Sequence, residues 1–153
     1  MTVPLTGLPG ILSVDHVGIA VPDLDAAIQL HTEVFGGTLV HREHNADQEI
    51  DEAMIRVGPA PSDGADTGTQ LQLIAPASPS STIAKFLDRN GPGLQQLAFR
   101  VADLDAATRA LRAAGLRLLY DEPRRGTADS LINFVHPKDA GGVLVELVQP
   151  AAR

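Results

Sequence analysis

Apolar and polar residues alternate along several short stretches of the chain, and apolar residues recur at helical spacing in others. Residues 14–21 alternate as a half-buried strand does. The next segment has apolar residues at helical spacing. Asp23 is a suitable N-cap for this helix, and the glycines that begin at Gly36 would end it. The apolar stripe of this predicted helix consists of Leu24, Ala27, Ile28, Val34 and Phe35. The chain therefore opens with a strand and a helix.

The same scheme continues to the end of the chain. After the first helix we expect strands near 38–44, 49–57 and 69–75, with a loop rich in Pro, Gly and Asp at 58–68. A connecting helix, capped by Ser81, is expected at 81–90. Beyond it we expect a strand at 94–101, a helix at 104–114, and strands near 116–120, 130–135 and 142–148.

The second half of this pattern repeats the first. The segment that begins with Val14 recurs 80 residues later, with Val21, Asp23, Leu24, Asp25, Ala26 and Ala27 identical in register. Residues 71–74 similarly match 145–148. We predict an α+β fold of two tandem βαβββ modules in a single domain. The predicted domain spans 12–149, with module 1 at about 12–76, the linker helix at about 81–90 and module 2 at about 93–149.

Four polar residues interrupt the apolar pattern of the strands. His16 is equivalent to Gln96 in the repeat, and Gln72 to Glu146. A carboxylate in an apolar strand is costly to bury without a partner such as a cation. Taken singly, each residue also fits a structural role, as a hydrogen-bonded side chain or a buried ion pair. If a pseudo-twofold axis brings them together, one imidazole, two amide oxygens and one carboxylate suit Co, Mn, Ni, Zn or Mg.

Composition narrows the classes of function. The 153 residues are 44% hydrophobic, and the formal net charge is -7, which argues against nucleic acid as the main partner. Cysteine is absent, so disulfides and thiolate chemistry are excluded. No apolar run approaches membrane-spanning length, and the first ten residues lack the features of a secretory signal. We expect a cytoplasmic protein with no membrane partner.

Several stretches resemble the methylmalonyl-CoA epimerases of the vicinal oxygen chelate superfamily. The resemblance covers about residues 12–149 and is most specific late in the chain. It is carried by residues 15–24, 52–54, 82–87, 90–94, 119–127, 133–138 and 141–147. It implies paired βαβββ modules that form a cupped mixed sheet around a divalent metal, commonly in a homodimer.

The resemblance also implies roles for individual residues. The family's metal ligands fall on His16, Gln72 and Glu146, and the fourth falls on Gln96. Most members have a His-His pair where this chain has two glutamines, so late transition metals should bind less tightly. Cobalt is the first expectation for the metal. Glu52 is the implied base for C2 of an acyl-CoA substrate and Glu146 the base for its other face, although an acidic, solvated edge strand also explains Glu52.

Coenzyme A is polyanionic, so an acidic protein needs local cations to bind its phosphates. The candidates within or near the matching stretches are Lys85, Arg124, Arg125 and Lys138, each of which also fits an ordinary surface role. Two other functions stay open. One is a glyoxalase-like isomerase or lyase of the same superfamily, and the other is a metal-free protein of this fold that sequesters small molecules.

Overall fold

The computed structural model describes residues 10–60 and 68–152, and these residues form two compact units. One unit runs from His16 to Gln95, and the other combines the residues through Asp15 with those from Gln96 onward. The predicted loop at 58–68 lies largely outside the described residues. Over the described ranges, no helix is both long and apolar enough to cross a membrane. The single domain over 12–149 stays a prediction.

The unit from His16 to Gln95 contains most of β1 and the first module's other strands in a mixed sheet. The strands follow the order β2-β3-β4-β1. Strands β1 and β4 are parallel, whereas β3 is antiparallel to both β2 and β4. The bounds are Ile11–Ala20 for β1, Thr38–Asn45 for β2, Ile50–Arg56 for β3 and Gln70–Pro76 for β4.

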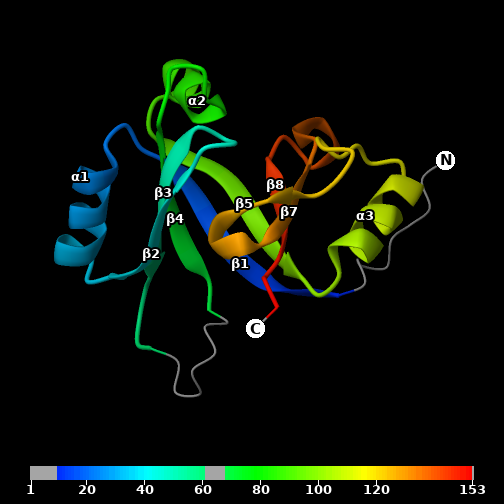
Figure 1. Ribbon diagram of the computed structural model, residues 1–153, viewed down its shortest axis with the longest axis horizontal. Coiled ribbons are helices and arrows are strands. Elements are labelled where there is room, and N and C mark those ends of the chain that lie inside the picture. Colours follow the sequence, from blue (N-terminus) through cyan, green and yellow to red (C-terminus); the bar gives the residue numbers. More distant parts are fainter. Residues whose placement is uncertain (1–9, 61–67, 153) are drawn as a thin grey trace. The chain divides into compact units, whose positions relative to one another are not determined.

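Two helices pack in this unit, α1 (Leu24–Gln29) and α2 (Thr82–Asn90) (Figure 1). Both N-caps are as predicted, because Asp23 accepts from the backbone N–H of Ala26 over 3.1 Å and Ser81 accepts from that of Ala84 over 3.0 Å. Helix α1 packs on one face of the sheet. The core there consists of Val21, Leu24, Ala27, Ala53, Ile55, Leu73 and Ala75.

The predicted apolar stripe of the first helix is wrong beyond Ile28. Residues Leu30–Val34 form a π-helical turn, in which the N–H of Phe35 donates to the carbonyl of Leu30 over 3.2 Å. A π turn adds a residue, which rotates every later side chain by about 100° around the helix axis. Val34 and Phe35 are therefore 69% and 65% exposed and do not enter the core.

The second unit repeats this architecture. Its strands follow the order β5-β8-β7-β6, with β5 and β8 parallel and the other neighbours antiparallel. Asp103 caps α3 (Leu104–Ala113) by accepting from the N–H of Ala106 over 3.0 Å, as Asp23 does for α1. The bounds are Gly93–Val101 for β5, Arg124–Arg125 for β6, Leu131–Val135 for β7 and Val145–Gln149 for β8. The α+β class and the tandem βαβββ order are confirmed.

The strand predicted near 116–120 is wrong, since Leu118 makes only an isolated bridge to Val135 there. The physical reason is the side chain of Asn133, which is fully buried. Its Oδ1 accepts from the N–H of Tyr120 over 3.2 Å, and its Nδ2 donates to the carbonyl of Tyr120 over 3.0 Å. Backbone hydrogen bonds join Arg117 and Leu119 to β7 and the residue after it, but at Tyr120 the Asn133 side chain takes the place of the backbone partner and the pairing stops there.

Candidate active site

In the unit from His16 to Gln95, the sheet face opposite α1 carries buried polar side chains. His16 and Gln72 are 3% and 4% exposed. Gly18 lies opposite Gln72 in the parallel pairing of β1 and β4, so His16 and Gln72 are diagonal neighbours on this face. Glycine at this position places no side chain beside the two polar groups.

Glu52 extends this polar face onto β3. It is 2% exposed, and its Oε2 accepts a hydrogen bond from Nε2 of Gln72 over 2.8 Å. An ionised carboxylate can only accept, so this bond fixes which end of the Gln72 amide points at Glu52. The amide oxygen of Gln72 is the atom that the bond does not use, and it is the atom a metal would need.

The other unit contains an equivalent pair. Ala98 on β5 lies opposite Glu146 on β8, so Gln96 and Glu146 are diagonal neighbours as His16 and Gln72 are. Nε2 of Gln96 donates to Oε2 of Glu146 over 3.0 Å, and both residues are buried. The apolar side chains that pack with Ala98 are Ile132, Phe134 and Val148, with Tyr120 and Leu144 at the edge of the cluster.

The donor chemistry of the predicted ligand set fits a hard or borderline divalent cation. His16 supplies an imidazole and Glu146 a carboxylate, and each glutamine uses its amide nitrogen in a bond to a glutamate. Within residues 10–60 and 68–152, no group of three or more His, Cys, Asp or Glu side chains is placed to hold a metal. A metal site made from these residues therefore depends on glutamine oxygens.

Three residues that the sequence analysis did not single out share the polar face with Glu52. They are Arg56 on β3, and His41 and Glu43 on β2. The antiparallel register puts Glu43 directly opposite Glu52 and His41 opposite Met54. The alternation of side chains along β3 could have indicated that Arg56 lies on the face of Glu52. His41 and Glu43 can be placed on that face only from the pairing register of β2 with β3.

Tyr120 is another residue that the sequence analysis passed over. Its ring contacts Phe134 edge to face, with centroids 5.9 Å apart, and the guanidinium of Arg124 lies 3.9 Å from its centroid. Burial raises the pKa of the Tyr120 hydroxyl and the charge of Glu146 raises it further, while Arg124 lowers it. Tyr120 therefore stays a neutral hydroxyl near Glu146 at neutral pH.

Within the second unit, the predicted phosphate-binding cations Arg124 and Arg125 lie apart from Lys138. Arg124 stacks on Tyr120, and Nε of Arg125 forms a 2.6 Å ion pair with Asp129. Lys138 follows the far end of β7, and five strand residues span about 17 Å. Lys85 lies on α2, in the other unit. Phosphate binding by Arg124 and by Lys138 would therefore occur at separate points of this unit.

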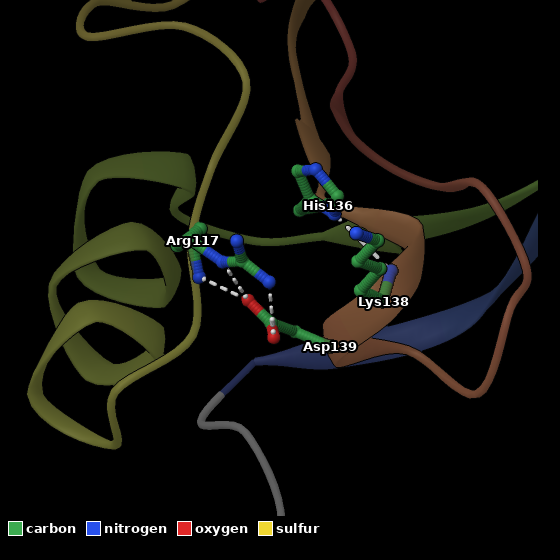
Figure 2. A network of polar contacts seen from close by, with 4 residues as sticks. All are labelled: Arg117, His136, Lys138 and Asp139. Atoms are coloured by element: carbon green, nitrogen blue, oxygen red, sulfur yellow. Dashed lines mark hydrogen bonds and ion pairs between the residues drawn. The ribbon is translucent and has the colours of Figure 1, made fainter.

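Lys138 borders a polar network that Figure 2 shows. Arg117 donates from Nε and its second guanidinium nitrogen to both carboxylate oxygens of Asp139, over 2.9 and 3.0 Å. These hydrogen bonds lower the pKa of Asp139 from 3.8 to about 2. The backbone N–H of Lys138 donates to Nδ1 of His136 over 3.1 Å, so the network positions the turn that carries Lys138.

Comparisons with known proteins agree with the motifs. The sequence model of the Glyoxalase/Bleomycin resistance protein/Dioxygenase superfamily matches residues 15–134. A methylmalonyl-CoA epimerase structure from Mycobacterium tuberculosis is 55% identical, with a TM-score of 0.85, and the match covers 98% of this chain and 94% of that chain. A Streptomyces coelicolor methylmalonyl-CoA epimerase variant in complex with 2-nitronate-propionyl-CoA is 43% identical, with a TM-score of 0.85 and coverages of 93% and 99%.

A curated relative gives the same result. The ethylmalonyl-CoA/methylmalonyl-CoA epimerase of Cereibacter sphaeroides is 34% identical over 137 residues, which are 88% of this chain and 96% of that protein. The resemblance to methylmalonyl-CoA epimerases that the motifs indicated is therefore confirmed.

Proposed function

Because the chain belongs to the glyoxalase/bleomycin resistance protein/dioxygenase superfamily, we propose that it is an isomerase that interconverts (2R)- and (2S)-methylmalonyl-CoA. The observation that carries this proposal in the structure is the buried carboxylate of Glu52, hydrogen-bonded to Gln72 on the polar sheet face that also contains His16. The similar epimerases supply the substrate class.

The reaction removes and replaces the proton on C2, which lies between a thioester and a carboxylate. Negative charge then builds on the thioester oxygen. His16, Gln72, Gln96 and Glu146 would hold a divalent metal, with cobalt expected before Mn, Ni, Zn or Mg. A metal bound there supplies Lewis-acid stabilisation of that negative charge. All four side chains are buried.

Glu52 would act as the general base on one face of C2. Its hydrogen bond from Gln72 holds one carboxylate oxygen and thereby orients the other. Epimerisation needs a second acid/base group on the opposite face of the planar intermediate. We assign that role to Glu146, which Gln96 orients in the same way.

Binding of the acyl-CoA would use exposed cations. Lys85, Arg124, Arg125 and Lys138 are the proposed phosphate partners, and their exposure makes them accessible to the polyanion. A homodimer and a cytoplasmic location are further parts of the proposal. The ethylmalonyl activity in the name of one relative suggests that other 2-substituted malonyl thioesters should be tested too.

The test supplies one isomer of methylmalonyl-CoA to the pure protein with Co²⁺ and follows the appearance of the other by chiral separation. The hemithioacetal of glutathione is assayed in parallel. Interconversion of the thioester isomers alone supports the proposal. Turnover of the hemithioacetal alone would favour a glyoxalase-like isomerase, and binding of either compound without turnover would favour a sequestering protein.

A further inference from the structure

Glu52 needs a way to exchange its proton with water. A group that removes a proton from one isomer must lose that proton before it can accept another. Glu52 is 2% exposed, so bulk water does not reach its carboxylate directly. A neighbouring side chain closer to solvent offers a route by which the proton leaves and the group is reset.

Glu43 is placed to take the proton from Glu52. The two residues face each other across the antiparallel pairing of β2 and β3. Side chains at directly opposed positions have Cβ atoms about 5 Å apart and point to the same side of the sheet. The side chain of Glu43 is 17% exposed, which places it between the buried face and solvent. One carboxyl group can then donate its O–H to the other.

His41 continues this series toward solvent. Its Nε2 lies 3.2 Å from Oε2 of Glu43 and is itself buried, although the two are not aligned as a hydrogen bond. The side chain as a whole is 37% exposed. An imidazole exchanges protons at both ring nitrogens, so it can accept at a buried nitrogen and release on its exposed side.

The residues form one polar line across the sheet of this unit. It runs from Gln72 on β4 to Glu52 on β3, and then to Glu43 and His41 on β2, the last strand in the order β2-β3-β4-β1. The opposite face of the same two strands has a comparable pair, in which Nδ1 of His44 lies 2.9 Å from Oδ1 of Asp51. That pair is exposed and does not lead to Glu52.

We propose that Glu43 and His41 form a proton path between Glu52 and solvent, an inference that rests on the proposed function. Glu52 donates its O–H proton to a carboxylate oxygen of Glu43, Glu43 passes a proton to Nε2 of His41, and the imidazole releases a proton to water. Glu52 and Glu43 return to their starting protonation, and the imidazole regains its starting tautomer by further proton exchange with water. Glu146, which has given its proton to the other face of C2, takes a replacement proton from water, so that one proton leaves to water and one returns from it.

The test compares His41→Gln and Glu43→Gln with the wild-type protein at saturating and limiting substrate. Both substitutions keep side-chain size and remove the proton-accepting group. If Glu52 loses its proton slowly between turnovers, that step limits kcat at saturating substrate. It does not limit kcat/KM, which reports the reaction of free enzyme with substrate. We therefore expect kcat to fall about tenfold while kcat/KM changes less than about twofold.

The isotopic readout uses the same variants in D₂O. In the variants, Glu52 should keep the substrate-derived proton and return it, so the recovered starting isomer should retain more protium at C2 than with wild type. A merely structural role lowers kcat and kcat/KM together without protium retention. His44→Gln is the matched control and should behave as wild type.

The outcomes separate the two proposals. Wild-type kinetics and deuterium content in both His41→Gln and Glu43→Gln would contradict the path and leave the epimerase proposal intact. Parallel loss of kcat and kcat/KM without protium retention would also contradict the path. A wild-type protein that interconverts no isomers contradicts the proposed function and the path with it.

Discussion

Gln72 donates a 2.8 Å hydrogen bond from Nε2 to Oε2 of Glu52, and both side chains are almost completely buried. One side chain thus links a proposed metal ligand to a proposed base. The bond orients both groups at once, because it holds one carboxylate oxygen and directs the amide oxygen elsewhere. Catalysis by this site should depend on the charge of Glu52 more than on its shape.

Glu52→Gln tests that dependence. Gln keeps an oxygen that can accept from Gln72 but cannot take a proton from carbon. We expect kcat to fall by about 10²- to 10⁴-fold, with folding retained. The measurement is the rate of isomer interconversion, and circular dichroism checks the fold. Asp51→Asn, the neighbouring carboxylate on the opposite face, is the control, and equal rates in the two variants would remove Glu52 from the mechanism.

Gln96→His tests the proposed metal site. A second imidazole should raise the affinity for late transition metals such as Co²⁺ and Zn²⁺ relative to Mg²⁺. The expected result is at least a tenfold lower Kd for Zn²⁺ in a competition titration, a change of about 1.4 kcal/mol. Gln95→His places the same group on the opposite face of β5 and should not change the Kd. An equal gain in both variants would argue against Gln96 as a ligand.

Asn133→Leu tests the hydrogen bonds between the Asn133 side chain and the backbone of Tyr120. Leucine is similar in volume but removes the acceptor of the N–H of Tyr120, whereas the carbonyl of Tyr120 keeps its 3.1 Å hydrogen bond from Arg112. We expect the free energy of unfolding in urea to fall by about 1–3 kcal/mol, because the N–H of Tyr120 is left without its hydrogen bond. The exposed residue Asn90 at the end of α2 provides a control, and Asn90→Leu should change stability far less.

Acid titration tests the Arg117–Asp139 pair. The pKa of Asp139 is lowered to about 2 from 3.8, so its stabilising contribution is present above about pH 4 and is lost as the pH falls toward 2. The carboxyl carbon of Asp139 should titrate in NMR spectra near this low value. In Arg117→Gln its midpoint should rise toward 3.8, whereas Arg109→Gln on α3 should leave it unchanged. A midpoint that stays low in Arg117→Gln would show that the guanidinium of Arg117 does not cause the lowered pKa, since the variant keeps the hydrogen bond from the backbone N–H of residue 117.

The repeat made much of the fold predictable from sequence. Because the two halves match in register, the equivalence of His16 with Gln96 and of Gln72 with Glu146 was predictable, whereas the diagonal placement within each half required the strand pairing. The caps at Asp23 and Asp103 followed from the same match. Alternation along β1 also gave the correct face for the core, since Ile19 and Val21 pack with α1.

The remaining features depend on information that the pattern does not contain. The register of β2 and β3 is set by the turn between them, where Glu49 adopts a left-handed conformation with φ of 56°. Few non-glycine residues do so, and this register brings Glu43 opposite Glu52. Two other features likewise depend on tertiary structure, which the local spacing of residues does not reveal. They are the π turn at Leu30 and the hydrogen bonds of the Asn133 side chain with the backbone of Tyr120.

The most direct test of the proposed function is deuterium exchange at C2 of methylmalonyl-CoA. The wild-type protein is incubated with a single isomer in D₂O, either with Co²⁺ or after treatment with a chelator. We predict deuterium uptake at C2 together with formation of the other isomer, both abolished by the chelator and restored by added metal. Absence of uptake with Co²⁺, Mn²⁺, Ni²⁺ and Zn²⁺ each supplied in turn would contradict the assignment.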